Sequence, residues 1–284
     1  MTDALEGPTA AGARVDAWRA EGATIGFVPT MGALHEGHLS LVRAAKRRCD
    51  RALVSIFVNP LQFAPGEDLE RYPRDFDGDR EKLASAGCDA VFTATPEEMY
   101  PADFSTYVVE DRLSTTLEGA SRPTHFRGVL TVVCKLFHVA RPDVAFFGQK
   151  DAQQALLIRR MVRDLGFRLE VSVEPIVRDP DGLALSSRNA YLDPHERTRA
   201  LSLSRALGAA RAAYDGGERD AAELRAAARS AIESGGVEPE YLEVRDAETL
   251  APLERVTEKA LVLVAARVGK TRLIDNAVLG GDAL

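Results

Sequence analysis

The sequence predicts an α/β protein, in which a parallel sheet with helices on both faces is followed by a smaller α+β domain. Short apolar runs alternate with amphipathic stretches through the first two-thirds of the chain. This alternation is typical of parallel sheets covered by crossover helices. The character changes near residues 178–182, where Pro and Gly stand between acidic residues and indicate a turn or hinge. We therefore place the domain boundary there, with one domain at residues 1–178 and the other at 179–284.

In the first domain, apolar runs that stop at turn residues predict strands, and stretches with helical spacing of apolar residues predict helices. The predicted strands cover residues 24–28, 52–58, 90–92, 144–147 and 169–173. The predicted helices cover residues 39–48, 79–86, 128–139 and 152–165.

The second domain begins with two stretches rich in Ala and Arg, which predict helices at residues 194–214 and 220–234. Three short apolar runs follow and predict strands at residues 241–244, 261–264 and 272–274. Helices followed by strands predict an α+β domain, in contrast to the alternation that precedes it.

The composition excludes several classes of protein. Hydrophobic residues make up 45% of the 284 residues and charged residues 28%, values typical of globular proteins and unlike those of disordered or fibrous chains. The formal net charge is -7, whereas proteins that grip nucleic-acid phosphates are usually basic. The three cysteines form no CxxC motif, and no apolar run is long enough to span a membrane. We expect a cytoplasmic protein that binds neither nucleic acid nor membranes.

The motif with the most chemical content is PTMGALHEGH, residues 29–38, which follows the first predicted strand and opens a helix. The N-terminus of a helix presents unpaired N–H groups and suits a phosphate. His35 and His38 are three residues apart and share a face of a helical turn, where both rings can donate hydrogen bonds to phosphate oxygens. Gly32 and Gly37 allow close approach of the backbone to a ligand.

Two other interpretations of this motif remain open at this point. The histidines could be two of three metal ligands, although HEGH lacks the spacing of the HExxH zinc motif. They could also be unrelated surface residues in a turn. The position after the first strand of a parallel sheet favours a ligand site. Neither GxGxxG nor GxxxxGKS is present, so a dinucleotide motif or a P-loop is not supported.

Two further motifs could hold phosphates. FGQKD, residues 147–151, ends a predicted strand and contributes Lys150, one of only six lysines, with Asp151 able to cap the next helix. LSSRN, residues 185–189, follows the hinge and places small hydroxyls beside Arg188, whose guanidinium matches phosphate oxygens. A surface lysine and an ordinary Ser-rich loop are the alternatives.

Two more motifs offer groups for a substrate. NPLQF, residues 59–63, ends the second predicted strand, and Asn59 and Gln62 can hydrogen-bond a hydroxylated or carboxylated molecule without a charge. HFRGV, residues 125–129, precedes an apolar helix, where Arg127 could meet an anion or be solvated. Together the clusters indicate a nucleotide site whose phosphates are held by histidine, lysine and arginine.

In these motifs the chain resembles the pantothenate synthetase (pantoate–β-alanine ligase) family of the HIGH-motif nucleotidyltransferases. PTMGALHEGH, IFVNPLQF, HFRGV, FGQKD and LSSRN occur in the family's order. The resemblance implies a Rossmann-like first domain, a C-terminal lid domain and a homodimer. It also implies an ATP-dependent reaction assisted by Mg²⁺, in which pantoate forms a pantoyl adenylate and releases pyrophosphate. β-Alanine then attacks the adenylate to give pantothenate and AMP.

The resemblance also implies roles for individual residues. His38 is the residue usually assigned as proton donor, and His35, Lys150 and Arg188 would act with it on the phosphates. Gln62 and Gln154 would bind pantoate, and Asp79 is the candidate magnesium ligand. Asn59 and Arg127 are further candidates for substrate binding from their residue types alone. The ATP contacts that the resemblance implies are Met31, Gly32, Ala33, Leu34, His35, Glu36, Gly37, His38, Gly148, Gln149, Lys150, Asp151, Val177, Leu185, Ser186, Ser187 and Arg188.

The chain departs from the family pattern at two positions. Leu185 stands where the family commonly has Met, a change that conserves volume. Gly78 replaces an acid that some relatives carry beside the residue corresponding to Asp79. A different transferase of the same superfamily and a nucleotide-binding regulator without activity are the alternatives to a ligase. The neutral amides of Gln62 and Gln154 argue against the first, and the complete set of phosphate-binding residues argues against the second.

Overall fold

The computed structural model describes residues 2–281 and 284, and the chain divides into two compact units. The first unit contains residues 1–148 and 153–174, and the second contains residues 149–152 and 175–284. The division falls after Glu174, whereas the sequence predicts it after Arg178. The sequence also gives no sign that residues 149–152, which follow a strand of the first unit, belong to the second.

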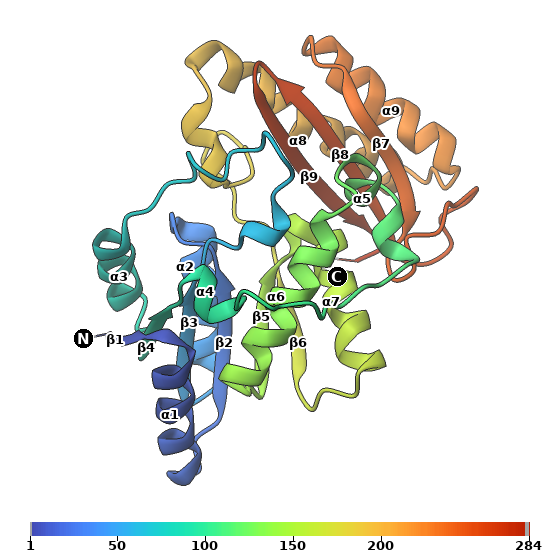
Figure 1. Cartoon of the computed structure of the whole chain (residues 1–284). Helices are drawn as coiled ribbons and strands as arrows, with labels where there is room; N and C mark the ends of the chain where they lie inside the picture. Colours follow the sequence, from blue (N-terminus) through green and yellow to red (C-terminus); the bar gives the residue numbers. More distant parts are fainter. Residues whose placement is uncertain (1, 282–283) are drawn as a thin grey trace. The chain divides into compact units, whose positions relative to one another are not determined.

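The first unit is built on a six-stranded sheet in which every strand pair is parallel (Figure 1). Its strand order is β1-β4-β3-β2-β5-β6. The chain moves outward from β2 through β3 to β4, then returns to the other side of β2 to form β5 and β6. The direction of winding therefore reverses between β2 and β5. The strands are β1 (Asp3–Glu6), β2 (Ile25–Thr30), β3 (Arg51–Ile56), β4 (Ala90–Thr93), β5 (Val144–Gly148) and β6 (Glu170–Glu174).

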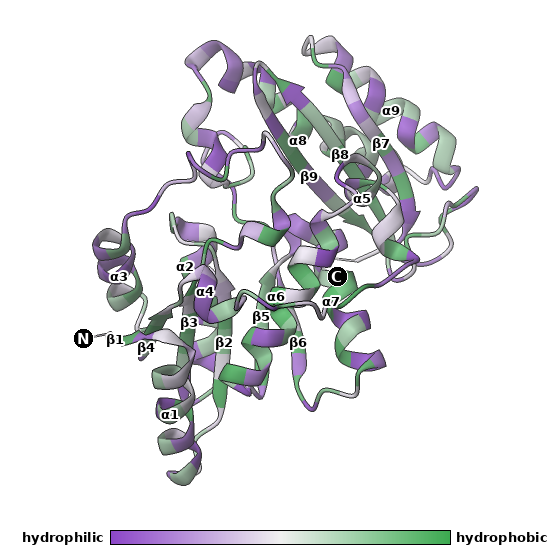
Figure 2. Cartoon of the chain, in the orientation of Figure 1, coloured by the Kyte–Doolittle hydropathy of each residue, from purple (hydrophilic) through white to green (hydrophobic). Residues whose placement is uncertain are grey.

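Helices pack on both faces of this sheet, as the sequence predicts. Val28 on β2 packs in one core with Val42 and Ala45 of α2. On the opposite face, Phe27 stacks on Phe92 and meets the edge of Phe137 from α6. All of β2 except Pro29 is buried, and the strand is largely green in Figure 2. The helices are α1 (Gly7–Ala20), α2 (Glu36–Arg48), α3 (Phe76–Ser85), α4 (Pro96–Met99), α5 (Glu118–Ser121), α6 (His125–Ala140) and α7 (Ala152–Asp164), with 3-10 turns η1 (Pro60–Gln62) and η2 (Leu113–Thr115).

The first strand and helix of the chain are absent from the sequence prediction, which assigns no element before residue 24. β1 lies at the sheet edge and pairs with β4 from Asp3 to Glu6. α1 begins with Pro8 near its N-terminus and buries Ala11, Val15 and Trp18. These side chains recur about once per turn among small and polar residues, so the apolar stripe is narrow.

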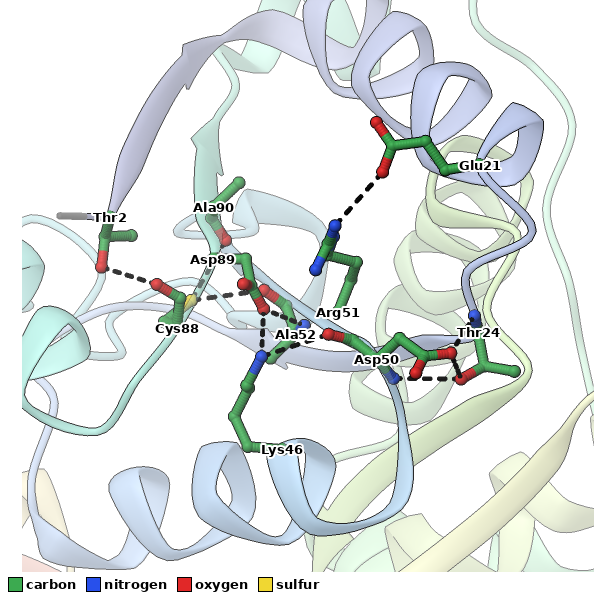
Figure 3. Close-up of polar contacts among 10 residues, drawn as sticks. All are labelled: Thr2, Glu21, Thr24, Lys46, Asp50, Arg51, Ala52, Cys88, Asp89 and Ala90. Atoms are coloured by element: carbon green, nitrogen blue, oxygen red, sulfur yellow. Dashed lines mark hydrogen bonds and ion pairs between the residues drawn. The ribbon is translucent and has the colours of Figure 1, made fainter.

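The amino ends of the strands are joined by aspartates that directly precede three of them. Figure 3 shows two of these aspartates, Asp50 and Asp89. Asp50, before β3, accepts hydrogen bonds from the main-chain N and the Oγ1 of Thr24 at 2.9 and 2.7 Å. Asp89, before β4, accepts from Ala52 N at 2.7 Å and from Lys46 Nζ at 2.8 Å. Asp143, before β5, accepts from Ile25 N at 2.7 Å. Each carboxylate therefore satisfies an N–H group at or beside the start of a neighbouring strand.

The second unit is an antiparallel sheet of order β7-β8-β9 packed with two helices, which confirms the predicted α+β arrangement. Leu203 and Leu207 of α8, Leu224 and Ile232 of α9, and Val262 of β8 share one core. The elements are η3 (Gln149–Asp151), η4 (Ser187–Tyr191), α8 (Pro194–Asp215), α9 (Ala221–Ser234), β7 (Pro239–Asp246), β8 (Ala260–Val268) and β9 (Thr271–Leu279).

The Pro- and Gly-containing stretch at residues 178–182, which the sequence predicts as a turn or hinge, is a turn held within the second unit. Arg178 forms a two-pronged ion pair with the buried Asp275, at 2.6 and 2.9 Å. Arg197 of α8 binds Asp179 at 2.6 Å and Asp181 at 2.9 Å. Several ion pairs therefore fix this turn to the helix and sheet that follow it. Among residues 2–281, no helix has the length and apolar character needed to cross a bilayer.

Candidate active site

The reversal of winding between β2 and β5 marks the place where open α/β sheets bind ligands, at the carboxyl ends of the strands. PTMGALHEGH spans the last residues of β2 and the start of α2, and FGQKD spans the last residues of β5 and η3. NPLQF follows β3 and forms η1. The three motifs therefore follow strands β2, β3 and β5, which lie side by side in the sheet.

The loop after β2 has an unusual backbone at two successive residues. Gly32 has φ 83° and Ala33 has φ 52°, both in the left-handed region that glycine adopts more easily than other residues. The Leu34 N–H then donates to Asp79 Oδ1 at 2.8 Å, and the Leu34 carbonyl accepts from Lys82 Nζ at 3.0 Å. Helix α3 thus holds the loop through two side chains.

Asp79, the predicted magnesium ligand, supports this loop through one of its carboxylate oxygens. Its side chain is only 1% exposed, and Oδ1 also lies 3.5 Å from Lys82 Nζ. Within the part of the chain that the structure describes, no three His, Cys, Asp or Glu side chains form a group able to hold a metal ion. The position of Asp79 fits a support for the loop that carries the histidines.

His35 and His38 lie together at the start of α2, with ring centroids 4.1 Å apart. His35 is the N-cap, and its Nδ1 accepts from Gly37 N at 3.2 Å. His38 Nδ1 accepts from His35 N at 3.3 Å. An Nδ1 that accepts carries no proton, so in the neutral ring the proton is on Nε2. The hydrogen bonds that cap the start of α2 therefore leave the proton of each neutral ring on Nε2, from which it can be donated.

Asn59 and Gln62 are held in place by the 3-10 turn that follows β3. Asn59 is 1% exposed, and its Oδ1 accepts from Leu61 N at 3.3 Å and from the Tyr100 hydroxyl at 2.7 Å. Its Nδ2 donates to Gly128 O at 3.1 Å and to Gln62 Oε1 at 3.0 Å. Gln62 Nε2 in turn donates to Met31 Sδ at 3.1 Å. Gln62 thereby connects η1 to the loop after β2.

Two side chains, one neutral and one cationic, hold the main chain of Gln62. His125 Nδ1 lies 2.9 Å from Gln62 O, and Arg122 Nη2 donates to the same oxygen at 3.1 Å. Burial, with a further contribution from the neighbouring Arg122, lowers the pKa of His125 to about 4. His125 is therefore neutral near pH 7 and donates its Nδ1–H to the carbonyl. Arg122 is itself paired with Glu67, at 2.8 and 2.6 Å.

Arg127 and Gln154, two predicted substrate-binding residues, lie on the first turns of helices. The Arg127 guanidinium covers the ring of Tyr107, with its carbon 3.7 Å from the ring centroid. Gln154 lies half-buried near the start of α7. Its neighbour Gln153 is buried and binds Leu113 O and Thr116 O at 2.8 Å, so Gln153 has a structural role.

In the second unit, η3 carries Gln149, Lys150 and Asp151. Lys150 Nζ lies 3.5 Å from Asp151 Oδ1, and its side chain is 22% exposed. The buried Asn276 of β9 donates from Nδ2 to the carbonyls of Gln149 and Lys150, both at 2.9 Å, while Gln149 Nε2 donates back to Asn276 Oδ1 at 3.2 Å. The Asn276 side chain therefore fixes the main chain at Gln149 and Lys150.

The predicted phosphate clamp, also in the second unit, is an ordered turn. Val177 O accepts from Leu185 N at 3.0 Å, so the two predicted ATP contacts face each other across the turn at residues 178–184. Ser186 caps η4 and accepts from Arg188 N at 3.3 Å. Ser187 and Arg188 form the first residues of η4.

The remaining predicted ATP contacts belong to the same segments. Glu36 and Gly37 form the first residues of α2, where Glu36 pairs with Arg43. Gly148 is the last residue of β5. The sequence prediction does not include Tyr100, Arg122 or Asn276. Tyr100 lies between Met99 and Pro101 and Asn276 follows Asp275, so the local sequence offers no signal for either.

Each unit contributes candidate groups that are mainly hydrogen-bond donors. The first unit offers the Nε2 atoms of two imidazoles and of Gln62, and the second offers an ammonium and a guanidinium. Such groups stabilise negative charge on a phosphate or carboxylate. Among the candidate residues described here, none forms a serine–histidine or cysteine–histidine pair of the kind that activates a side-chain nucleophile. These residue types suit a reaction in which a bound substrate supplies the nucleophile.

The pantoate–β-alanine ligase family model matches residues 5–278 of the chain. A pantothenate synthetase of Acidobacterium capsulatum is 59% identical over 258 residues, which are 90% of this chain and 86% of that protein. A pantothenate synthetase of Anaeromyxobacter dehalogenans is 56% identical over 279 residues, or 96% of each chain.

Solved structures are similar over almost the whole chain. The crystal structure of pantothenate synthetase from Thermus thermophilus superimposes with a TM-score of 0.92 and 47% identity, and the match covers 97% of this chain and 99% of that one. A pantoate–β-alanine ligase from Francisella tularensis, complexed with β,γ-ATP and β-alanine, gives a TM-score of 0.82 at 32% identity and covers 99% of both chains.

Proposed function

The chain belongs to the pantoate–β-alanine ligase family, and from this membership we propose that it joins pantoate to β-alanine in two steps that consume ATP. In the first step, an oxygen of the pantoate carboxylate attacks the α-phosphorus of ATP. The bond from that phosphorus to the bridging oxygen breaks, and pyrophosphate leaves. In the second step, the amine of β-alanine attacks the carbonyl carbon of pantoyl adenylate. AMP leaves with the bridging oxygen, and the amine proton is released to solvent.

The observation that carries the proposal is the pair of donor histidines at the start of α2. Because His35 and His38 both accept a main-chain N–H through Nδ1, each ring offers a proton on Nε2 without first binding a proton from solvent. Hydrogen bonds from these atoms to the phosphates would strengthen as pyrophosphate gains charge. We propose that His38 and His35 stabilise the departing pyrophosphate in this way.

The other predicted contacts keep their proposed roles. Lys150 and Arg188 would bind the ATP phosphates, together with the main chain of residues 31–37, 148–151, 177 and 185–187. Gln62 and Gln154 would bind pantoate through neutral amides, and Arg127 would attract its carboxylate. The buried Asn59 would contribute by holding Gln62 in place. One charged group among neutral amides fits a substrate with one carboxylate and two hydroxyls.

Magnesium is a prediction of the family resemblance, with Asp79 as its candidate ligand. Mg²⁺ usually binds through substrate phosphates and water with few protein ligands. One oxygen of Asp79, Oδ1, is engaged by Leu34 N and Lys82. A homodimeric state and a cytoplasmic location are likewise proposals that rest on the sequence.

Exchange of labelled pyrophosphate into ATP tests the first step by itself. We expect exchange that depends on pantoate and proceeds without β-alanine. Exchange driven by an amino acid in place of pantoate, or no exchange at all, would contradict the proposal. Lys150→Ala should reduce the exchange rate by orders of magnitude while the protein remains folded, and a near-normal rate would refute a phosphate role for Lys150. His195→Ala, at an exposed position on α8, is the matched control and should change the rate less than about two-fold.

A further inference from the structure

We infer that Tyr100 is a positioning residue, which acts through Asn59 to make Gln62 present a hydrogen-bond donor to the substrate. The inference rests on the proposed function, because it takes pantoate as the ligand of Gln62. Tyr100 follows α4, in a segment that contains none of the site motifs. The residues concerned all belong to the first unit.

The orientation of the Asn59 amide is determined by main-chain groups. Leu61 N can only donate, and it approaches Oδ1 at 3.3 Å. Gly128 O can only accept, and it lies 3.1 Å from Nδ2. Rotating the amide by half a turn would place an oxygen against a carbonyl and an amino group against an N–H. The side chain is also almost completely buried, so water cannot replace these partners.

The orientation of Asn59 determines that of Gln62. Asn59 Nδ2 lies 3.0 Å from the end of the Gln62 side chain, and an amino group there requires an oxygen as its partner. Gln62 therefore turns Oε1 toward Asn59 and Nε2 toward Met31 Sδ, 3.1 Å away. A thioether sulfur is a weak acceptor and can be replaced by a substrate oxygen. The amide thus has a defined polarity, with its donor end facing the loop that carries the histidines.

Tyr100 strengthens this arrangement through its hydroxyl, 2.7 Å from Asn59 Oδ1. Its ring packs against Phe57 and Phe104, with centroids 6.0 and 5.0 Å away, so the hydroxyl has little freedom to move. Burial raises the pKa of Tyr100, which keeps the hydroxyl protonated and able to donate. The hydroxyl is the second donor on Oδ1 and makes the reversed amide of Asn59 still less favourable.

The close approach of α6 to η1 is also needed for the relay. A Cβ on Gly128 would lie 2.2 Å from Leu61 O and 2.6 Å from Gln62 N, both main-chain atoms. Only glycine lets the first turn of α6 come near enough for its carbonyl to reach Asn59. A glycine, a tyrosine and a buried amide therefore all serve the orientation of one side chain.

The chemical consequence is that the direction of the Gln62 amide decides whether pantoate meets a hydrogen-bond donor or an acceptor. A donor Nε2 attracts the oxygens of a carboxylate or a hydroxyl, whereas a reversed Gln62 would offer an oxygen and repel a carboxylate. Neutral amides can therefore favour a carboxylated substrate, provided that their direction is fixed. The hydroxyl of Tyr100 contributes to affinity for pantoate without touching it.

Tyr100→Phe removes the hydroxyl and keeps the packing of the ring. We expect the Kd for pantoate to rise about five-fold, as for the loss of one hydrogen bond, with the KM for ATP unchanged within about two-fold. Tyr107→Phe is the matched control: Tyr107 belongs to the same aromatic cluster, meeting the Phe104 ring edge to face at a centroid distance of 5.2 Å, and its hydroxyl has no hydrogen-bond partner among the described residues. The control should bind pantoate as the unmodified protein does. An unchanged Kd in Tyr100→Phe, or an equal change in the control, would overturn the inference.

A double-mutant cycle separates positioning from a direct or purely structural effect. In a Gln62→Ala background, Tyr100→Phe should cause no further rise in the Kd for pantoate, since the side chain on which it acts is gone. A rise of about five-fold that persists in this background would show that Tyr100 acts independently of Gln62 and would refute the relay.

An experiment without ligand keeps the relay distinct from the proposed function. The side-chain NH₂ resonances of Gln62, observed in ¹⁵N-labelled protein, should shift or broaden in Tyr100→Phe and stay in place in Tyr107→Phe. If the unmodified protein fails to bind pantoate and these resonances still shift, the proposed substrate is wrong and the relay stands. Unchanged Gln62 resonances would refute the relay whatever the substrate.

Discussion

The two edges of the parallel sheet use polar side chains in opposite ways. At the amino edge, Asp50 and Asp89 direct full charges at main-chain N–H groups of Thr24 and Ala52, and Asp89 also pairs with Lys46 (Figure 3). Asp143 does the same for Ile25 N and pairs with Arg19. At the carboxyl edge, neutral imidazoles and amides are oriented by hydrogen bonds at one end, which makes the atom at the other end a donor. Charged carboxylates therefore have protein partners at the edge where they stabilise the fold. Neutral side chains are held in one orientation at the edge where a charged ligand would bind.

The largest expected effect is on the reaction rate when the His38 side chain is removed. His38→Ala removes an Nε2 donor from the phosphates and should lower the rate of pyrophosphate exchange about 100- to 1,000-fold, the usual effect of losing one such donor. The free energy of unfolding should change by less than about 1 kcal/mol, because the ring is only partly buried. Exchange rates and denaturant unfolding measure the two quantities. A rate within about five-fold of normal would show that the carboxyl edge does not carry the reaction.

Acid should affect the two edges over separate ranges of pH. The pKa of His125 is lowered to about 4 by burial and by Arg122, so the unfolded chain binds this proton more readily than the folded one. Stability should be complete above about pH 6.5 and should fall by roughly 3 kcal/mol as the pH drops to about 4. His125→Gln should remove this decline.

Asp50 supplies the contrast, because hydrogen bonds from Thr24 lower its pKa below the ordinary 3.8. The stability that it contributes is present above about pH 3.8 and is lost only as the pH falls through the lower value in the folded protein. Unfolding by urea at a series of pH values measures both ranges. A stability that stays constant from about pH 6.5 to about 4 would contradict the assignment for His125.

A substitution at Asp89 tests whether the amino edge contributes to stability and not to the reaction. Asp89→Ala leaves Ala52 N and Lys46 without their partner and should cost about 2 kcal/mol of unfolding free energy. The remaining folded protein should show normal pyrophosphate exchange per molecule. Loss of exchange with stability retained would mean that this edge has a catalytic role that the structure does not explain.

Substitution of Asp79 should have the smallest effect on the exchange rate. It distinguishes a support for the loop from a magnesium ligand. Asp79→Asn keeps an oxygen for Leu34 N, so we expect the exchange rate to fall less than about five-fold. A magnesium ligand would behave differently, because loss of its charge would sharply reduce the rate and change its dependence on magnesium concentration. Measuring exchange across a magnesium titration separates these outcomes.

The motifs at the carboxyl ends of the strands are easier to recognise in the sequence than the first strand and helix of the chain. Residues of the site come in contiguous motifs, and helix α2 begins where the spacing of His35 and His38 places a shared face. The strand β1 and helix α1 are missed because their stability comes from pairing with β4 and from a narrow stripe around Trp18. Such tertiary contacts leave little trace in local composition.

The supports of the site are equally hard to predict. Tyr100 lies 41 positions from Asn59 in the sequence, and Asn276 lies 127 from Gln149, so only the fold brings each pair together. The family resemblance suggests Asp79 as a magnesium ligand, and the structure adds that it is buried and bonded to Leu34 N, a contact that its local sequence does not reveal. The type of a residue suggests a chemical group, but its partners decide whether it binds substrate or protein.

The central claim is that the pantoate carboxylate attacks the α-phosphorus of ATP and forms an acyl adenylate. The most direct measurement uses pantoate labelled with ¹⁸O in its carboxylate, together with ATP and β-alanine, and analyses the AMP by mass spectrometry. The proposed mechanism predicts one ¹⁸O atom in each AMP, because the bridging oxygen of the adenylate leaves with the phosphate. AMP without ¹⁸O, or ¹⁸O in pyrophosphate, would contradict it.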